Sequence, residues 1–227
     1  MLFLLAVSAG SADGWSYFGL GHAFVANMTG NTVLAGIAVF QSGHHVAHTL
    51  LSIGCYALGV AVAAFLTRKV RPGVIWARAI TRALLLEAAV MAAAAVAWII
   101  IHRRPSPNDA HPLTLLLGCV AFAIGLQSGA MLQLKIPGIV TTYITGTWTS
   151  LMSGLVHFAT GSQSSSPRQR INFEERLLMQ AGILAAYFLA AVLTGWCFRY
   201  QPLAVGVLSA SSVCIVAVYA SLRAARA

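Results

Sequence analysis

The stretch Phe24-Val-Ala-Asn-Met-Thr-Gly-Asn-Thr-Val-Leu-Ala-Gly36 is apolar at both ends and polar in its middle. A second stretch, Val140-Thr-Thr-Tyr-Ile-Thr-Gly-Thr-Trp-Thr-Ser-Leu-Met-Ser-Gly154, has the same pattern, with Thr145-Gly146 in the place of Thr29-Gly30. A plain membrane helix does not need a cluster of hydroxyl and amide side chains at its centre. We therefore predict an interrupted helix at a Thr-Gly step in each half of the chain.

The composition places the protein in a membrane. Of its 227 residues, 59% are hydrophobic and only 8% are charged, and the mean hydropathy is +0.80. A soluble domain carries about 25% charged residues. The net charge of +9 does not indicate nucleic acid, because the Lys and Arg residues lie at the ends of apolar runs. We predict an all-α polytopic membrane protein in which residues 1–227 form a single membrane domain.

The two halves of the chain resemble each other, which predicts an internal duplication. The first repeat covers residues 1–102 and the second covers residues 112–222. The equivalent positions are Gly10 with Gly125, Thr29-Gly30 with Thr145-Gly146, Tyr56 with Tyr187, and Arg68 with Arg199.

The distribution of positive charge predicts how the two repeats are oriented. If each Thr-Gly segment enters the membrane and returns, eleven of the 14 Lys and Arg residues lie on one side and three on the other. If each segment crosses fully, the split is about even, contrary to the positive-inside rule. The first arrangement gives two inverted repeats, with six full transmembrane helices plus two interrupted or re-entrant Thr-Gly segments. It places both termini in the cytoplasm.

Four motifs resemble those of the YoaK-like family of uncharacterised bacterial inner-membrane proteins. They are Ser8-Ala-Gly-Ser-Ala-Asp13, the Phe24–Gly36 stretch, Gly125-Leu-Gln, and Thr141-Thr-Tyr-Ile-Thr-Gly. The resemblance extends over essentially the whole chain. It implies a multi-pass protein of the bacterial inner membrane, without an established substrate or reaction. Ser128 departs from the family pattern, in which we expect Asn, so an amide-specific role at this position is not carried over.

The polar residues of the two segments are candidate ligands for a small polar or anionic solute. Free backbone N–H groups at half-helix N-termini carry a partial positive charge, which suits an anion. The alternative is hydrogen bonding and close packing between helices, which is common at Thr and Gly in membrane bundles. The candidate set is Asp13, Asn27, Thr29, Gly30, Asn31, Thr32, Gln127, Thr142, Thr145, Gly146 and Thr147.

Asp13 and Glu87 are acidic residues inside predicted spans, and both are candidates for proton coupling. A carboxylate at a helix centre costs about 2.5–3.5 kcal/mol on insertion scales, so such residues tend to be functional. Glu87 follows Arg82 by five positions, and an interfacial ion pair is its alternative interpretation. Asp13 is therefore the preferred coupling group.

These patterns favour a small transporter or channel with a midplane site between the repeats. The alternatives are an intramembrane enzyme that uses Asp13 with a histidine, and a non-transporting structural subunit. No arrangement typical of a catalytic nucleophile, a metal site or a cofactor site occurs in the sequence, so we expect no catalytic residue, no metal and no cofactor. The expected partners are the lipid bilayer and a small solute, and so short a chain favours a homodimer.

Overall fold

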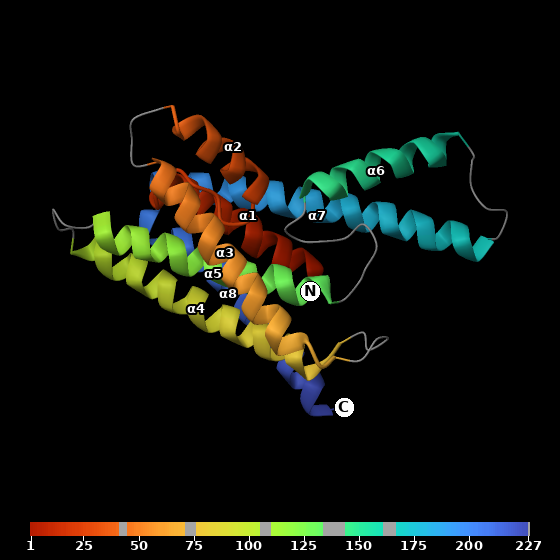
Figure 1. Cartoon of the computed structure of the whole chain (residues 1–227). Helices are drawn as coiled ribbons and strands as arrows, with labels where there is room; N and C mark the ends of the chain where they lie inside the picture. The colour runs from red at the N-terminus through yellow and green to blue at the C-terminus, as the bar shows by residue number, and fades with distance from the viewer. Residues whose placement is uncertain (41–44, 71–75, 105–109, 134–143, 161–166, 227) are drawn as a thin grey trace.

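The computed structural model describes residues 1–40, 45–70, 76–104, 110–133, 144–160 and 167–226, which form helices and no strand (Figure 1). The helices, in chain order, are α1 (Leu2–Gly19), α2 (Met28–Ala38), α3 (His45–Thr67), α4 (Arg78–Arg103), α5 (Ala110–Leu132), α6 (Ile144–Ala159), α7 (Pro167–Tyr200), the 3₁₀ helix η1 (Pro202–Ala204) and α8 (Val205–Arg226). Thr142 lies outside the described residues.

Several of these helices are long and apolar enough to cross a membrane. Within the described ranges, α3, α4, α5, α7 and α8 each contain such a segment, with mean hydropathies between 1.9 and 2.4. Large apolar side chains face outward on them, including Leu115 (71% exposed) and Leu178 (74% exposed). Such exposure suits contact with lipid, not water. α1 has 18 residues but includes Asp13 and three serines, and it is not one of these five.

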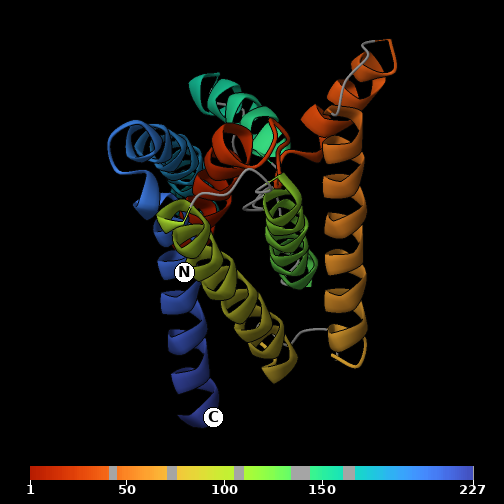
Figure 2. The same cartoon turned by 90° about the vertical axis from the view of Figure 1, so that its left-hand side faces the viewer.

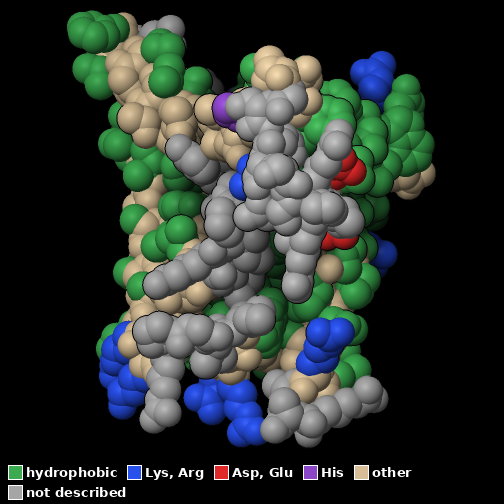
Figure 3. Space-filling view, turned by 90° about the vertical axis from the view of Figure 1, so that its right-hand side faces the viewer, with side chains coloured by type: hydrophobic (Ala, Val, Ile, Leu, Met, Phe, Trp, Pro, Cys, Tyr) green, Lys and Arg blue, Asp and Glu red, His purple; other side chains and the backbone are tan. Residues whose placement is uncertain are grey.

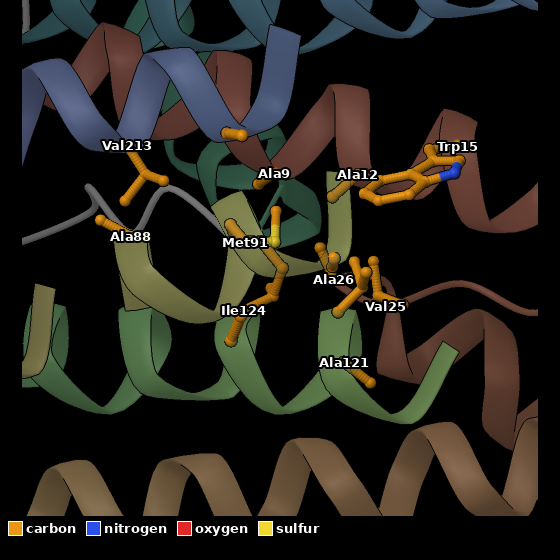
Figure 4. Close-up of a cluster of buried hydrophobic side chains, with 14 of the residues drawn as sticks. Ala9, Ala12, Trp15, Val25, Ala26, Ala88, Met91, Ala121, Ile124 and Val213 are labelled. Atoms are coloured by element: carbon orange, nitrogen blue, oxygen red, sulfur yellow. The ribbon is translucent and has the colours of Figure 1, made fainter. Parts of the chain in front are cut away.

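Helices α1 and α5 contact each other at the centre of the bundle. In α5, 72% of the most apolar window is buried inside the protein, against 22% in α3, which lies at the edge (Figure 2). The core combines small residues of α1 with Met91 of α4 and Ile124 of α5 (Figure 4). Trp15 and Trp98 pack edge to face in the same core, with ring centroids 5.7 Å apart.

The first helix of each half packs on a helix of the other half. α1 packs on α7, and α5 packs on α3. Gly10 and Gly125 lie at these crossings, where a Cβ on Gly10 would collide with the backbone of Tyr187 and a Cβ on Gly125 with that of Tyr56. The contacts of α1 with α8 and of α5 with α4 also correspond, and α4 packs on α8. Glycine is required at both crossings because the two backbones touch there.

Helices α2 and α6 are shorter than the spans, with 11 and 16 residues. Each begins near the middle of the molecule, and they run toward opposite ends of it (Figure 1). The irregular backbone lies ahead of the first Thr-Gly step, because the chain turns back after α1 at Gly21 (φ +118°) and His22 (φ +56°). Thr29-Gly30 and Thr145-Gly146 occupy the first turns of α2 and α6. The prediction of helix breaks at these steps is corrected accordingly.

Candidate functional site

A cavity of about 540 Å³ lies where the N-terminal ends of α2 and α6 meet the middle of the bundle. Residues from both halves of the chain line it: Ala26, Asn27, Met28, Thr29, Tyr56, Ser128, Leu132, Ile144, Thr145 and Tyr187. The structure thus brings the two predicted Thr-Gly segments to one space, with Thr29 and Thr145 both exposed on its lining. Tyr56 of α3 and Tyr187 of α7, which are equivalent in sequence, also reach it.

Asp13 is buried behind this cavity, where its carboxylate holds the segment that enters α2. One carboxylate oxygen accepts hydrogen bonds from the backbone N–H groups of Val25 and Ala26, both at 2.7 Å. The other accepts a hydrogen bond from the Tyr187 hydroxyl. Hydrogen bonds to a charged group are the stronger kind, contributing about 1.5–3 kcal/mol each. Asp13 therefore joins α1, α7 and the entry to α2, and it reaches the cavity through Tyr187.

Asn31 fixes the same segment from the other side. Its side-chain oxygen accepts from the backbone N–H of Phe24 at 2.8 Å, and its amide donates to the Phe24 carbonyl at 2.6 Å. The amide also donates to the Ser52 hydroxyl of α3 at 3.2 Å. Asn31 is fully buried and does not line the cavity. Its contacts satisfy backbone groups that a break in the helix leaves without partners.

Asn27 and Thr32 are exposed, and both side chains bond within α2. Asn27 is the N-cap of the helix, accepting from the Gly30 N–H at 3.0 Å. The Thr32 hydroxyl donates to the Met28 carbonyl at 2.9 Å and lies outside the cavity lining. Asn27 lines the cavity as well as capping the helix, so its amide, unlike that of Asn31, is placed to meet a solute.

The candidates in the second half of the chain are divided between the cavity and the core. Gln127 is buried, and its amide donates to the Leu5 carbonyl of α1 at 3.1 Å. Ser128, one residue on, lines the cavity and donates to the Ile124 carbonyl of its own helix at 3.0 Å. Thr147 is buried in α6, and Gly146 follows Thr145 in the first turn. Of this group, Ser128 and Thr145 line the cavity.

Glu87 is buried in α4 and does not line the cavity. Among the residues that the structure describes, none donates a hydrogen bond to either of its carboxylate oxygens. The two acidic candidates thus differ sharply, because Asp13 has three donors. A buried carboxylate without donors is costly, whereas the donors around Asp13 offset that cost.

Tyr56 and Tyr187 were not predicted as site residues, although both line the cavity. Their equivalence in sequence served only as a sign of duplication. A phenol in the middle of an apolar helix was the available signal, because tyrosines in membrane proteins concentrate near the ends of spans.

The lining offers neutral polar groups to a ligand. It combines hydroxyls and one amide with apolar side chains, and none of its described residues is charged. Neither α2 nor α6 has an acidic residue in its first turn. The Asp13 carboxylate partly compensates the positive end of α2 through Val25 and Ala26, whereas the first turn of α6 keeps its partial positive charge. Across the described part of the chain, no group of three His, Cys, Asp or Glu residues is placed to hold a metal ion.

The fold and the site define a multi-pass α-helical membrane protein with a polar cavity between its two halves. The family model described as "Protein of unknown function (DUF1275)" matches residues 1–220, and the chain belongs to that family. The chain is 32% identical over 197 residues to the UPF0700 transmembrane protein YoaK of Bacillus subtilis (strain 168), a match covering 85% of this chain and 80% of the relative. No solved structure matches the chain.

Proposed function

We propose that this protein is a small membrane transporter or channel that passes a small polar or anionic solute through the cavity. The observation that carries the proposal is that the first turns of α2 and α6 line one cavity, in which hydroxyls and an amide lie among apolar side chains. Irregular backbone at this depth is tolerated only where protein buries it or where it borders a water-filled cavity. The neutral hydroxyls and the partial positive charge at the start of α6 favour a solute that is anionic or rich in acceptors.

The second part of the proposal is that the halves are inverted repeats, residues 1–102 and residues 112–222. Under this arrangement α1, α3, α4, α5, α7 and α8 cross the membrane, and α2 and α6 are re-entrant. The corresponding contacts of α1 with α7 and α5 with α3 support it. The opposite directions of α2 and α6 support it too (Figure 1). Secondary transporters built this way bind their solutes at the repeat interface.

Flux measurements test the proposal directly. Purified protein in liposomes is expected to accelerate the swelling caused by at least one member of a panel of small neutral polyols and monovalent anions. Replacing Thr29 and Thr145 together by Val should reduce that flux by about tenfold, because it removes two polar contacts at the lining. The matched control is Thr32→Val with Thr149→Val, which takes one threonine from each of the same two helices but leaves the lining intact.

Two outcomes of this experiment contradict the proposal. Wild-type liposomes that swell no faster than protein-free ones across the whole panel would favour the structural-subunit alternative. Equal losses of flux in the two double variants would show that the flux does not depend on the cavity lining. The enzyme alternative needs a histidine beside Asp13, whereas its carboxylate accepts hydrogen bonds from two backbone N–H groups and a tyrosine hydroxyl.

Proton coupling through Asp13 is the third part of the proposal. Protonating Asp13 would weaken its hold on Tyr187 and on the start of α2, and both of these border the cavity. Asp13→Asn is expected to leave a folded protein whose flux no longer depends on pH. Glu87→Gln is the comparison variant, because Glu87 is the other coupling candidate. Unchanged pH dependence in folded Asp13→Asn, together with its loss in Glu87→Gln, would transfer the coupling role to Glu87.

A homodimer completes the proposal, because 227 residues leave little scaffold around a moving pathway. Light scattering of the protein in detergent, corrected for the bound detergent, measures the mass of the complex. A mass of one chain at all concentrations would exclude the dimer under these conditions and leave the cavity proposal intact.

A further inference from the structure

A second pocket, of about 490 Å³, lies between the C-terminal end of α3 and the N-terminal end of α4. Three cations line it: Arg68 and Lys69 just beyond α3, and Arg82 in α4. All three side chains are exposed. Phe65 and Leu66 form part of its apolar wall, and they are also exposed on the last turns of α3. The pocket therefore joins a group of positive charges to an apolar surface.

The positive charges in this pocket are not neutralised by its lining. The chain has only five acidic residues, and none of the four that the structure describes lines the pocket. Asp13 and Glu87 are buried in the bundle, and Glu174 and Glu175 belong to α7. Like charges held close together repel one another, so the pocket favours an anion that can compensate several of them at once.

Several contacts hold the walls of the pocket in place. The Arg68 guanidinium stacks on the Phe65 ring, 3.6 Å from its centroid, which keeps the charge beside the apolar wall. The backbone N–H of Val70 donates to the Thr67 carbonyl at 2.9 Å, which shapes the turn after α3. On the other side, the Trp76 indole N–H donates to the Thr81 hydroxyl at 3.0 Å, at the start of α4.

The depth of the pocket matches the headgroup layer of a bilayer. One candidate span ends at Thr67 and the next begins at Arg78, so the pocket lies where two spans leave the hydrocarbon. Lys and Arg side chains gather at this end of the molecule (Figure 3). Phe65 and Leu66 lie just inside this boundary, where the acyl chain of a lipid would run.

We propose that this pocket binds the phosphate group of an anionic phospholipid, with Arg68, Lys69 and Arg82 around the phosphate and Phe65 and Leu66 along an acyl chain. Basic pockets between helices on the cytoplasmic side of membrane proteins recognise lipid headgroups through this chemistry. A free phosphate ion would use the same cations but would gain nothing from the apolar wall. The proposal is independent of solute passage, because the pocket shares no residue with the cavity.

Titration of the purified full-length protein in a neutral detergent tests this assignment. The probes are dioctanoyl phosphatidylglycerol, dioctanoyl phosphatidylcholine and sodium phosphate, with the bound species counted by native mass spectrometry. Wild type is expected to bind one phosphatidylglycerol more tightly than the other two probes. The pocket variant Arg68→Gln/Lys69→Gln/Arg82→Gln should weaken that binding by about tenfold or more, because each cation near an anionic headgroup adds to the attraction.

The matched control is Arg103→Gln/Arg104→Gln/Arg199→Gln, which removes three exposed cations that do not line the pocket. Its affinity for phosphatidylglycerol should be within about twofold of wild type, since charges far from the pocket are largely screened by salt. Equal losses in the two triple variants, or equal binding of phosphatidylcholine, would overturn the proposal. Sodium phosphate that binds as tightly as phosphatidylglycerol would assign the pocket to a free anion and overturn the lipid assignment.

Discussion

The two helix crossings at the centre of the molecule share a backbone geometry but differ in the polar residue beside it. At the first, Gly10 of α1 meets Tyr187 of α7, and at the second, Gly125 of α5 meets Tyr56 of α3. Three residues after Gly10 the chain has Asp13, whereas three residues after Gly125 it has Ser128. Asp13 ties its tyrosine to the start of α2, while the Ser128 hydroxyl donates to its own helix.

The close helix crossings are common to both halves of the molecule, whereas the polar contacts beside them differ. At each crossing the backbone of a glycine touches the backbone of a tyrosine, and this contact allows the two helices to approach closely in both halves. The carboxylate belongs to one half alone, where it accepts hydrogen bonds from backbone N–H groups of the segment between α1 and α2. The three predictions that follow test this division, beginning with the position where the halves differ most.

The largest effect is expected at Asp13. Asp13→Ala leaves two buried backbone N–H groups and the Tyr187 hydroxyl without their acceptor. We expect a loss of about 2–4 kcal/mol of unfolding free energy, because buried donors without partners are costly. Ser128→Ala should lose about 0.5–1 kcal/mol, as for an ordinary hydrogen bond. Denaturant titration in mixed micelles compares the two variants, and equal losses would contradict the asymmetry.

An intermediate effect is expected for the paired tyrosines. Tyr187→Phe removes a hydrogen bond to a carboxylate, which should cost about 1.5–3 kcal/mol. Tyr56→Phe should be close to neutral in stability, since no hydrogen bond found in the described part of the chain involves the Tyr56 hydroxyl. The thermal unfolding of both variants in detergent measures this difference. A Tyr56→Phe loss as large as that of Tyr187→Phe would mean that the second crossing has a polar link of similar strength.

The smallest effects are expected at the glycines, and they should be equal in the two halves. Gly10→Ala and Gly125→Ala each place a methyl group against the backbone of the facing helix, which should cost about 1–3 kcal/mol through overpacking. Gly54→Ala is the control, because a Cβ there meets no atom within 4 Å. It should be neutral or slightly stabilising, as alanine favours a helix. Thermal unfolding that shows only one crossing to be sensitive would break the equivalence of the halves.

The membrane class and much of the helix order followed from the sequence, because apolar runs of span length are explicit in it. The equivalence of Gly10 with Gly125 was also visible, and both glycines do lie at close crossings. The packing of α1 on α7 and of α5 on α3 could not be predicted from the sequence. A sequence match shows which positions correspond, but it does not show which of them are in contact. Asn31 was predicted as a solute ligand, yet the structure has it holding the backbone of Phe24.

The meeting of the two Thr-Gly segments was predictable, but the hydrogen bonding around them was not. Thr29 and Thr145 were expected to meet, and they line one cavity. The structure alone shows that the Asp13 carboxylate has three donors while that of Glu87 has none among the described residues, because hydrogen bonding depends on residues distant in the chain. Arg82 was considered as a partner for Glu87, but it is exposed and lines the basic pocket.

The exchange of partners also governs the order of assembly during synthesis. Asp13 lies 174 residues ahead of Tyr187, and Ser8 lies 201 residues ahead of Ser209, to which it is hydrogen-bonded. At roughly 5–20 residues per second, α1 waits on the order of ten seconds or more after its own translation before α7 exists. Through that interval α1, with its carboxylate and three serines, lacks its contacts with α7 and α8. The first half therefore cannot complete its packing until the second half has been made, and neither half is expected to be stable when it is produced alone.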